Sequence, residues 1–394
     1  MSEGPSFNIP IARTSFTSTE IVSVLQPLES GWLVQGPKVA LFENEWSAFN
    51  KSKFSIAMNS CTSALHLSLL ALGIKAGDEI IVPAFTWVST ANVCEFLGAK
   101  VVFCDIDIDT FNISVAQLEK LITPKTKAIM PVHLFGLAAD MTPIMELARS
   151  HGIFVVEDAA CGLGAKYKGI NVGNFGNAGC FSFHPRKTIT TGEGGIVTCS
   201  DSDLGEKITR LRDHGAQVTD LQRHLGNKPY LLADHPEPGL NQRMTDIQAA
   251  LGVAQMSRVH DILCERRRLA NIYNEAFGSV DWLQTPFSDP NYEHGYQSFP
   301  CLFLPQEKGL KNIEKTNQRR NSFMSYLQSV GISTRPATHA VHMLSYYSER
   351  YNVAPEDYPN SFRANHASVS LPLFHGLLEL EQQYVIEKVR EYKV

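Results

Sequence analysis

The sequence predicts an α/β fold in which a mostly parallel β-sheet lies between layers of helices. Between residues 54 and 200, short β-rich runs alternate with segments of helical periodicity. The runs that predict strands are 54–57, 79–82, 101–104, 127–130 and 154–157. Strands that alternate with helices usually pair in parallel, and ligands of such sheets bind at the carboxyl ends of the strands.

The helices between these strands carry caps and apolar stripes. Ser114, for example, precedes a stripe that runs from Val115 to Ile122, which predicts a capped helix there. Beyond Gly215 the alternation stops, and a polar stretch rich in Pro and Gly, residues 228–239, is predicted to be a long functional loop.

The rest of the chain predicts a long helical run followed by a smaller α+β unit. The helical run covers 245–277, and an apolar strand is expected near 299–304. Helices are expected near 318–330 and 378–389. We therefore predict a large α/β domain over residues 1–258 and a smaller C-terminal α+β domain over residues 259–394.

Composition excludes several classes of protein. The chain has 394 residues, a net charge of −5 and a pI of about 6.2, with no long run of Lys or Arg. This balance argues against a nucleic-acid partner. The start of the chain lacks the pattern of a secretory signal, and no stretch approaches the roughly 20 apolar residues that cross a bilayer. Eight scattered cysteines without a CxxC pair predict neither a zinc site nor a disulfide framework, so we expect a cytoplasmic protein.

Lys187 is the first candidate catalytic residue. It follows Phe181-Ser182-Phe183-His184-Pro185-Arg186 and precedes the glycine-rich turn at 192–195. Apolar surroundings desolvate an amine, which lowers its pKa and prepares it to form a Schiff base. The alternative is an ordinary surface lysine in a glycine turn.

Asp158 ends the apolar run 154–157 and is the second candidate. A carboxylate at the edge of the sheet can keep a pyridine nitrogen protonated. The alternatives are a helix cap and a metal ligand.

Ser60, Cys61 and Thr62 lie where a predicted strand meets a predicted helix. Free backbone N–H groups and the helix dipole make such a junction an anion site, and Ser182 is expected close enough to share a phosphate. The alternative is simple helix capping, which uses the same residue types.

Trp87 follows the strand predicted at 79–82, and its flat ring can stack on a cofactor and exclude water from one face. The alternative is packing within the core. Taken together, the four segments predict a site for pyridoxal 5'-phosphate.

The same residues carry a family resemblance. The segments 77–87, 157–160, 181–195 and 244–252 resemble those of the nucleotide-sugar aminotransferases of DegT/StrS type, and the likeness is collinear from about residue 30 to residue 373. The resemblance implies a fold-type I enzyme that uses pyridoxal phosphate to move an amino group, generally from L-glutamate, onto a keto sugar carried by a nucleoside diphosphate. Pyridoxamine phosphate is the implied intermediate form of the cofactor, and ping-pong kinetics follow.

The resemblance also implies a role for each candidate. Lys187 is the implied Schiff-base lysine and general acid/base, Asp158 the partner of the pyridine nitrogen, and Trp87 the stacking ring. The implied phosphate ligands are Ser60, Cys61, Thr62 and Ser182. A homodimer with shared active sites is implied too, in which Asn241 reaches the cofactor phosphate of the neighbouring subunit.

Two positions depart from the family pattern. Relatives commonly have Gln or His where this chain has Cys161, the implied contact of the ring's phenolic oxygen, and a thiol is a weak hydrogen-bond partner. At Cys61 a glycine would let the backbone approach the phosphate, whereas a cysteine side chain must turn aside.

Candidates for substrate contacts rest on weaker signals. Arg335 and His342 resemble the family's C-terminal substrate loop, where an arginine can pair with a diphosphate. His184 lies beside the lysine and is a further candidate, while His133 is expected to be a packed turn residue.

Several other functions remain open or are excluded. Sugar 3-dehydratases related to this family have histidine at the lysine position, so Lys187 favours transamination. We expect amination at C4 of a 4-keto-6-deoxyhexose, with C3 as the alternative. A non-catalytic nucleotide-sugar-binding protein is a further alternative. No strand is followed by GxGxxG, which excludes an NAD-dependent dehydrogenase, and residues 105–116 lack the Gly and Glu of a calcium loop, so no metal is expected.

Overall fold

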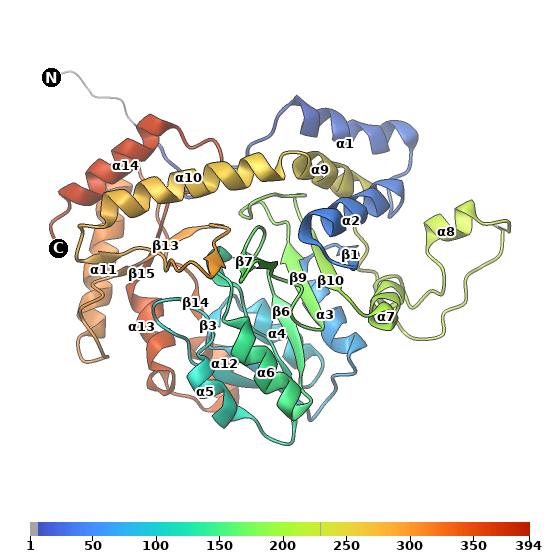
Figure 1. Cartoon of the computed structure of the whole chain (residues 1–394), viewed down its shortest axis with the longest axis horizontal. Helices are drawn as coiled ribbons and strands as arrows, with labels where there is room; N and C mark the ends of the chain where they lie inside the picture. The colour runs from blue at the N-terminus through green and yellow to red at the C-terminus, as the bar shows by residue number, and fades with distance from the viewer. Residues whose placement is uncertain (1–6, 229) are drawn as a thin grey trace.

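A seven-stranded sheet forms the centre of the computed structural model, which describes residues 7–228 and 230–394 (Figure 1). The strand order is β1-β10-β9-β6-β5-β2-β4. Strand β10 pairs antiparallel with both of its neighbours, and the other pairs are parallel, so six strands point the same way. The strands are β1 (Phe54–Met58), β2 (Glu79–Pro83), β4 (Lys100–Cys104), β5 (Thr126–Ile129), β6 (Phe154–Asp158), β9 (Ala178–Ser182) and β10 (Gly195–Cys199).

The five strands predicted from the sequence are confirmed to within one residue at each end, and so is the mostly parallel sheet. The prediction did not include β9 and β10. Both contain glycine, which weakens the strand pattern, although Gly179 and Gly195 each lie where another backbone passes too close for a Cβ.

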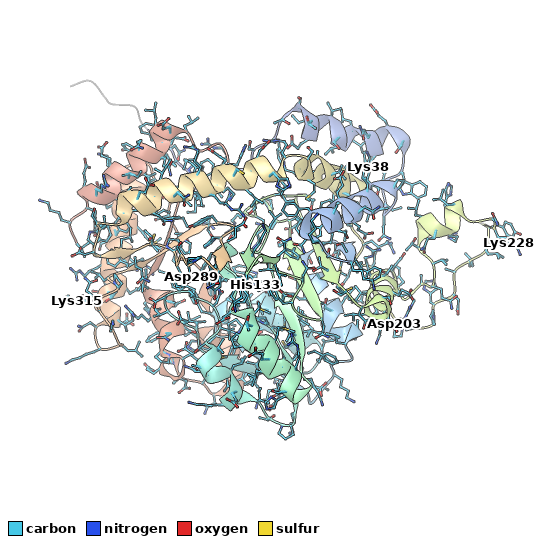
Figure 2. The ribbon with its side chains drawn as sticks, viewed as in Figure 1. Lys38, His133, Asp203, Lys228, Asp289 and Lys315 are labelled. Carbon is cyan, nitrogen blue, oxygen red and sulfur yellow. The ribbon has the colours of Figure 1, made fainter. Side chains whose placement is uncertain are left out.

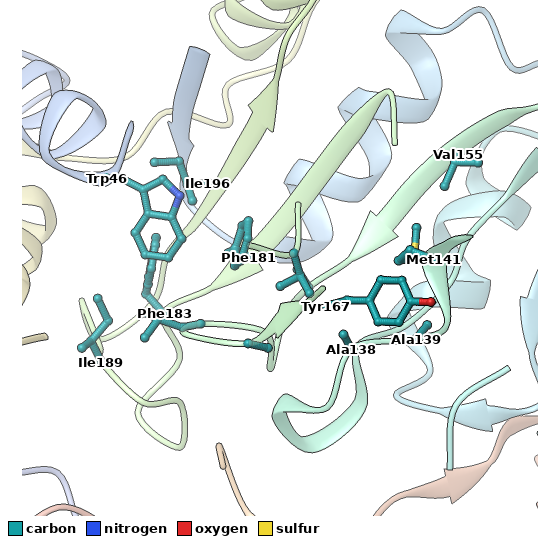
Figure 3. Packing of buried hydrophobic residues seen from close by; sticks show 14 of the residues in the cluster. Trp46, Ala138, Ala139, Met141, Val155, Tyr167, Phe181, Phe183, Ile189 and Ile196 are labelled. Atoms are coloured by element: carbon teal, nitrogen blue, oxygen red, sulfur yellow. The ribbon is translucent and has the colours of Figure 1, made fainter. Parts of the chain in front are cut away.

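Helices cover both faces of this sheet. The helices of this part of the chain are α1 (Ser18–Ser30), α2 (Pro37–Asn50), α3 (Cys61–Ala71), α4 (Ser89–Phe96), α5 (Val115–Leu118), α6 (Met141–His151), α7 (Ser202–Arg212), α8 (Asp220–Leu225), α9 (Asp246–Met256) and α10 (Val259–Phe277). Alternate residues of each strand point to opposite faces. In β9, Phe181 packs with Trp46 and Phe183 on one face (Figure 3), while Cys180 joins a second core on the other.

The C-terminal part forms a smaller α+β unit, as expected. Its antiparallel sheet has the order β11 (Leu283–Gln284), β13 (Phe299–Phe303) and β15 (Ser368–Leu371). Its helices are α11 (Ile313–Ser329), α12 (Ser345–Tyr351), α13 (Pro359–Ala367) and α14 (Glu379–Glu391). Helix α10 reaches both units, because Ile262 lies in a core of the large sheet and Tyr273 in the C-terminal core. The boundary predicted at 258/259 falls in the short break between α9 and α10.

Short strand pairs join distant segments. Strand β12 (Tyr292–Glu293) pairs with β7 (Lys166–Tyr167), which in turn pairs with β8 (Ile170–Asn171). Strand β14 (His339–Ala340) pairs with β3 (Phe85–Thr86) and so brings the C-terminal part against the segment before Trp87.

Three local predictions need correction. Ser114 makes no capping hydrogen bond through its side chain, and α5 gives way after one turn to a 3-10 helix at Glu119–Leu121. The helix expected near 318–330 begins earlier, at Ile313. This start was not predicted because polar residues occupy most of the first turns of the helix. The run expected over 245–277 is two helices.

The loop predicted at 228–239 follows α8, and together they project from the body of the molecule (Figure 1). Pro229 lies outside the described residues. Among the helices of the described part of the chain, none is both long and apolar enough to cross a membrane.

Candidate active site

The topology brings the predicted site residues to one edge of the sheet. Because six strands are parallel, β1, β6 and β9 end at the same edge, and the antiparallel β10 begins there. Asp158 is the last residue of β6 and Ser182 the last of β9, while Ser60 follows β1 by two residues. Residues far apart in the sequence therefore meet where ligands of such sheets bind.

Asp158 is buried and held on both carboxylate oxygens. Thr90, in the first turn of α4, donates its hydroxyl hydrogen to Oδ2 of Asp158 across 2.7 Å. The backbone N–H of Ala160 donates to Oδ1 at 3.1 Å. A buried carboxylate fixed by two hydrogen bonds keeps a defined direction. Thr90 was not predicted as a site residue. The one feature of the sequence that points to Thr90 is its position one helical turn after Thr86.

Lys187 lies in the turn after β9, and its Nζ donates to Sγ of Cys161 at 3.2 Å. The turn is fixed by the N–H of Lys187, which donates to the carbonyl of His184, and by Thr190, which donates to the carbonyl of Phe183. Burial lowers the pKa of Lys187, but the neighbouring Cys161, Cys61 and Asp158 raise it by more. The net shift is upward, so the lowered pKa expected from the sequence is wrong for the chain without its cofactor.

The N-terminus of α3 provides a candidate phosphate site. Ser60 is the N-cap, and its Oγ accepts from the N–H of Ser63 at 3.1 Å. Ser60 is therefore a helix cap, the alternative to a phosphate ligand. The first N–H groups of a helix have no partner within the helix, which leaves those of Cys61 and Thr62 for an anion.

Gly195, at the start of β10, packs directly against this turn. A Cβ on Gly195 would lie 2.4 Å from the carbonyl carbon of Ser60 and 2.5 Å from the nitrogen of Cys61. This close approach, made possible by glycine, fixes the helix N-terminus beside the end of β9. Ser182 closes that side, and its Oγ accepts from the N–H of His184 at 3.5 Å.

Cys61 and Cys161 differ in environment. The side chain of Cys61 is buried in the core on the α3 face of the sheet. Burial raises its pKa, which keeps the thiol neutral. Cys161 is only partly buried and contacts Lys187. The structure thus places Cys161 beside the candidate cofactor lysine.

Trp87 lies between β3 and α4, with 58% of its surface exposed. Its ring centroid is 5.7 Å from that of His339 on β14. The carbonyl of Trp87 accepts a hydrogen bond from the backbone N–H of Thr90, the residue whose hydroxyl donates to Asp158. The indole is therefore not core packing, and its free face is available to a flat ligand.

Asn241 lies in an extended stretch that follows the projecting segment. Its backbone pairs with Asp213, and the next residue, Gln242, accepts a hydrogen bond from the N–H of Asn59. The side chain of Asn241 is exposed. Its expected contact with a partner's cofactor stays a prediction.

The three substrate candidates differ in accessibility. Arg335 is exposed, and its backbone pairs with Ser370. His184 is half-buried, and burial lowers its pKa. His342 is fully buried against Phe103 and Tyr358, and its Nε2 lies 3.1 Å from the carbonyl of Pro355. The expected contact of His342 with substrate is therefore a wrong prediction, because aromatic packing closes it off from a ligand.

A buried network behind Asp158 was also missed. Glu157 accepts from the backbone N–H groups of Gly173, Phe175 and Gly176 at 2.6–2.8 Å, and its Oε2 lies 2.8 Å from Nε2 of His133. Nδ1 of His133 accepts from the N–H of Ala139, so Nε2 carries the proton that points at Glu157. His133 is central in the molecule (Figure 2) and is a packed turn residue, as expected.

Among the described residues, no group of three or more His, Cys, Asp or Glu side chains has the arrangement of a metal site. The site instead combines an amine, a buried carboxylate, a helix N-terminus and an exposed indole at one sheet edge.

Comparisons with known proteins show which proteins this chain resembles. The model of the DegT/DnrJ/EryC1/StrS aminotransferase family matches residues 15–390. The spore coat polysaccharide biosynthesis protein SpsC of Bacillus subtilis is 37% identical over 97% of this chain and 96% of its own length. The GDP-perosamine synthase of Escherichia coli O157:H7 is 36% identical over 98% of both chains. The PMP-form structure of Spr1654 from Streptococcus pneumoniae gives a TM-score of 0.88 at 28% identity, covering 97% of this chain and 98% of that one.

The chain belongs to the DegT/DnrJ/EryC1/StrS aminotransferase family. It has the fold-type I aminotransferase fold, and within that family it is a sugar aminotransferase dependent on pyridoxal phosphate. The residues present fit that cofactor, because the N-terminus of α3, the Asp158 carboxylate and the Lys187 amine lie at the same edge of the sheet.

Proposed function

We propose that this enzyme transfers an amino group from L-glutamate to a keto sugar carried by a nucleoside diphosphate, at C4 of a 4-keto-6-deoxyhexose. The proposal rests on one observation. The Lys187 amine, the Asp158 carboxylate and the α3 N-terminus lie together at one edge of the sheet. Relatives named for GDP-perosamine synthesis and for spore coat polysaccharide biosynthesis support a nucleotide-linked amino sugar as the product.

Each residue has a stated task in this proposal. When bound, pyridoxal phosphate supplies an electron sink that makes the α-hydrogen of an amino acid acidic. Asp158, oriented by Thr90, holds a proton at the pyridine nitrogen. The N–H groups of Cys61 and Thr62 and the Ser182 hydroxyl bind the phosphate, and Trp87 excludes water from one face. Lys187 binds the aldehyde and moves a proton to and from the α-carbon.

The sugar nucleotide is placed on the exposed side of the site. Strand β14 brings the segment after Arg335 against β3, next to Trp87. The exposed Arg335 guanidinium pairs with the diphosphate in this proposal, and His184 contacts the sugar. We place the reaction in the cytoplasm, and the eight free thiols are in keeping with a reducing compartment.

A homodimer completes the proposed site. Helix α1 exposes apolar side chains along its length, and the projecting segment around α8 exposes more. These residues are Ile21, Val22, Leu25, Leu28, Leu225, Tyr230, Leu231 and Leu232. Exposed apolar side chains gathered on one helix and one projecting segment mark interaction surfaces, and a second copy of the chain is the occupant we propose. Asn241, at the base of the projecting segment, then reaches the partner's cofactor phosphate.

Two measurements test the reaction. Borohydride reduction of the yellow holoenzyme should attach the cofactor to the peptide that contains Lys187. Incubation with L-glutamate and a panel of keto sugar nucleotides should release 2-oxoglutarate with the preferred sugar. Loss of a C3 hydroxyl without 2-oxoglutarate would instead indicate a dehydratase, and an amino group at C3 would correct the position.

Mixing two inactive variants tests the shared site. In a mixed dimer of Lys187→Ala and Asn241→Ala chains, one site has both its lysine and its partner asparagine. Because half of the dimers are mixed and each has one intact site, activity should recover to about a quarter of the wild-type value. No recovery, with mixed dimers present by mass, would show that Asn241 acts within its own subunit.

A further inference from the structure

Cys161 lies in the turn after β6, three residues beyond Asp158, with its Sγ 3.2 Å from Nζ of Lys187. Six of the eight cysteines are buried, whereas Cys161 is partly exposed and Cys264, on α10, is exposed. Cys161 is therefore the one thiol that is both reachable from solvent and in contact with an amine that the site uses.

The contact gives an oxidised Cys161 a partner. The thiolate is the form of a cysteine that reacts with oxidants, and burial raises the pKa of Cys61 and disfavours its thiolate. When Cys161 is oxidised, the Lys187 amine 3.2 Å away can trap the oxidised sulfur.

We propose that Cys161 is an oxidation site at which peroxide links Sγ to Nζ of Lys187 and so switches the enzyme off. The effect on activity rests on the proposed role of Lys187, whereas the linkage itself does not. The lysine is free to react when no cofactor is bound, and also when the cofactor carries the amino group between the two half-reactions.

The step balances with hydrogen peroxide as the oxidant. The thiolate attacks one peroxide oxygen and breaks the O–O bond, which gives a sulfenic acid and hydroxide. Hydroxide takes a proton from the ammonium of Lys187 to form water. The neutral amine then attacks sulfur, a second water leaves, and an N–S bond forms. Sulfur is oxidised by two electrons, and one peroxide is reduced to two waters.

The test uses protein freed of its cofactor and, in parallel, holoenzyme incubated with L-glutamate. Treatment with a small excess of hydrogen peroxide should lower the intact mass by about 2 Da, because the linkage removes two hydrogens. Tryptic peptides containing Cys161 and Lys187 should appear joined, and dithiothreitol should separate them. Excess pyridoxal phosphate without glutamate should protect the pair.

Variants separate this linkage from other reactions. Cys161→Ser should abolish the mass loss, with Cys161→Ala as a second variant. Cys264→Ser should keep the mass loss and normal activity. A Cys61–Cys161 disulfide would also remove two hydrogens, but it could not form in Cys61→Ser. The mass loss should therefore persist in Cys61→Ser if the partner of Cys161 is Lys187.

Two outcomes overturn the proposal. One is oxygen added to Cys161 without a joined peptide, and the other is a mass loss that survives in Cys161→Ser. If the peptides join but borohydride attaches the cofactor to a different lysine, the linkage stands and the proposed function of Lys187 fails.

Discussion

The hydroxyl of Thr90 lies 2.7 Å from Oδ2 of Asp158, and both side chains are buried. The backbone N–H of Thr90 donates to the carbonyl of Trp87, and Oγ1 of Thr90 lies 3.1 Å from Oγ1 of Thr86. One side chain thus connects the segment that presents the indole to the carboxylate proposed for the pyridine nitrogen. The relative position of a stacking ring and an anionic partner is therefore set within a single helical turn.

Replacing Thr90 with valine should weaken cofactor binding. Valine keeps the shape of threonine but removes the donor, so the buried Asp158 carboxylate loses a hydrogen bond to a charged group that is worth about 1.5 kcal/mol. The dissociation constant of pyridoxal phosphate, measured by fluorescence titration of the apo chain, should rise about tenfold. Thr90→Ser keeps the hydroxyl and should bind like the wild type. Equal affinities for the valine and serine variants would contradict the role given to Thr90.

Gly195→Ala should lower both stability and cofactor affinity. The added Cβ would lie 2.4 Å from backbone carbon of Ser60, and backbone cannot move aside as a flexible side chain can. Overpacking of this kind costs about 1–3 kcal/mol of the free energy of unfolding, which urea denaturation measures. The matched control is Gly205→Ala within α7, whose nearest neighbour is Sγ of Cys199 at 3.3 Å. There alanine favours the helix, so a loss as large as that at Gly195 would show that the tight contact is not the cause.

The sequence was sufficient for features that depend on local pattern. Strands such as 154–157 were recognisable because β-branched residues filled both faces of a buried parallel sheet. The edge at which Asp158 and Lys187 meet then followed from the parallel direction of the strands. Helix starts were less certain, since Ser114 is of a capping type but makes no such bond.

What the sequence could not provide depends on contacts between distant residues. Thr90 and Asp158 are 68 positions apart, and nothing in the pattern around either one names the other. Likewise a histidine in an amphipathic segment looks the same whether it faces substrate or packs on aromatic rings. His342 does the latter, which only the three-dimensional arrangement of Phe103 and Tyr358 reveals.

Glu157→Gln should destabilise the fold strongly. The carboxylate accepts three backbone N–H groups and faces the protonated Nε2 of His133, whereas an amide would turn its NH2 group toward donors. The free energy of unfolding should fall by about 3 kcal/mol, because buried donors to a charged acceptor lose their partner. Glu349→Gln makes the same chemical change on the exposed surface of α12 and should leave stability unchanged. Urea unfolding curves that coincide for the two variants would contradict the prediction.

Glu20 should contribute stability that disappears in acid. Its buried carboxylate accepts from the N–H of Thr17 at 2.8 Å, from Gln255 at 2.7 Å and from Arg258, and so attaches α1 to the segment around α9. Burial raises the pKa of Glu20, but the hydrogen bonds from Thr17 and Arg258 lower it by more, to about 2. Between pH 4.5 and 2 the unfolded chain binds a proton that the folded chain does not. The stabilisation is therefore complete above pH 4.5 and is lost as the pH falls toward 2.

Glu20→Gln should accordingly be less stable than the wild type at pH 7 by about 2 kcal/mol, and the difference should shrink between pH 4.5 and pH 3. Urea unfolding at pH 7, 5 and 3 measures it, and Glu29→Gln, exposed on the same helix, is the control for a general change of charge. Helix α1 carries the exposed Leu25 and Leu28 of the proposed dimer surface. The Glu20 variant should therefore also form a weaker dimer, with a higher dissociation constant in sedimentation experiments. A difference that stays constant from pH 7 to pH 3 would show that the charge of Glu20 does not hold α1 in place.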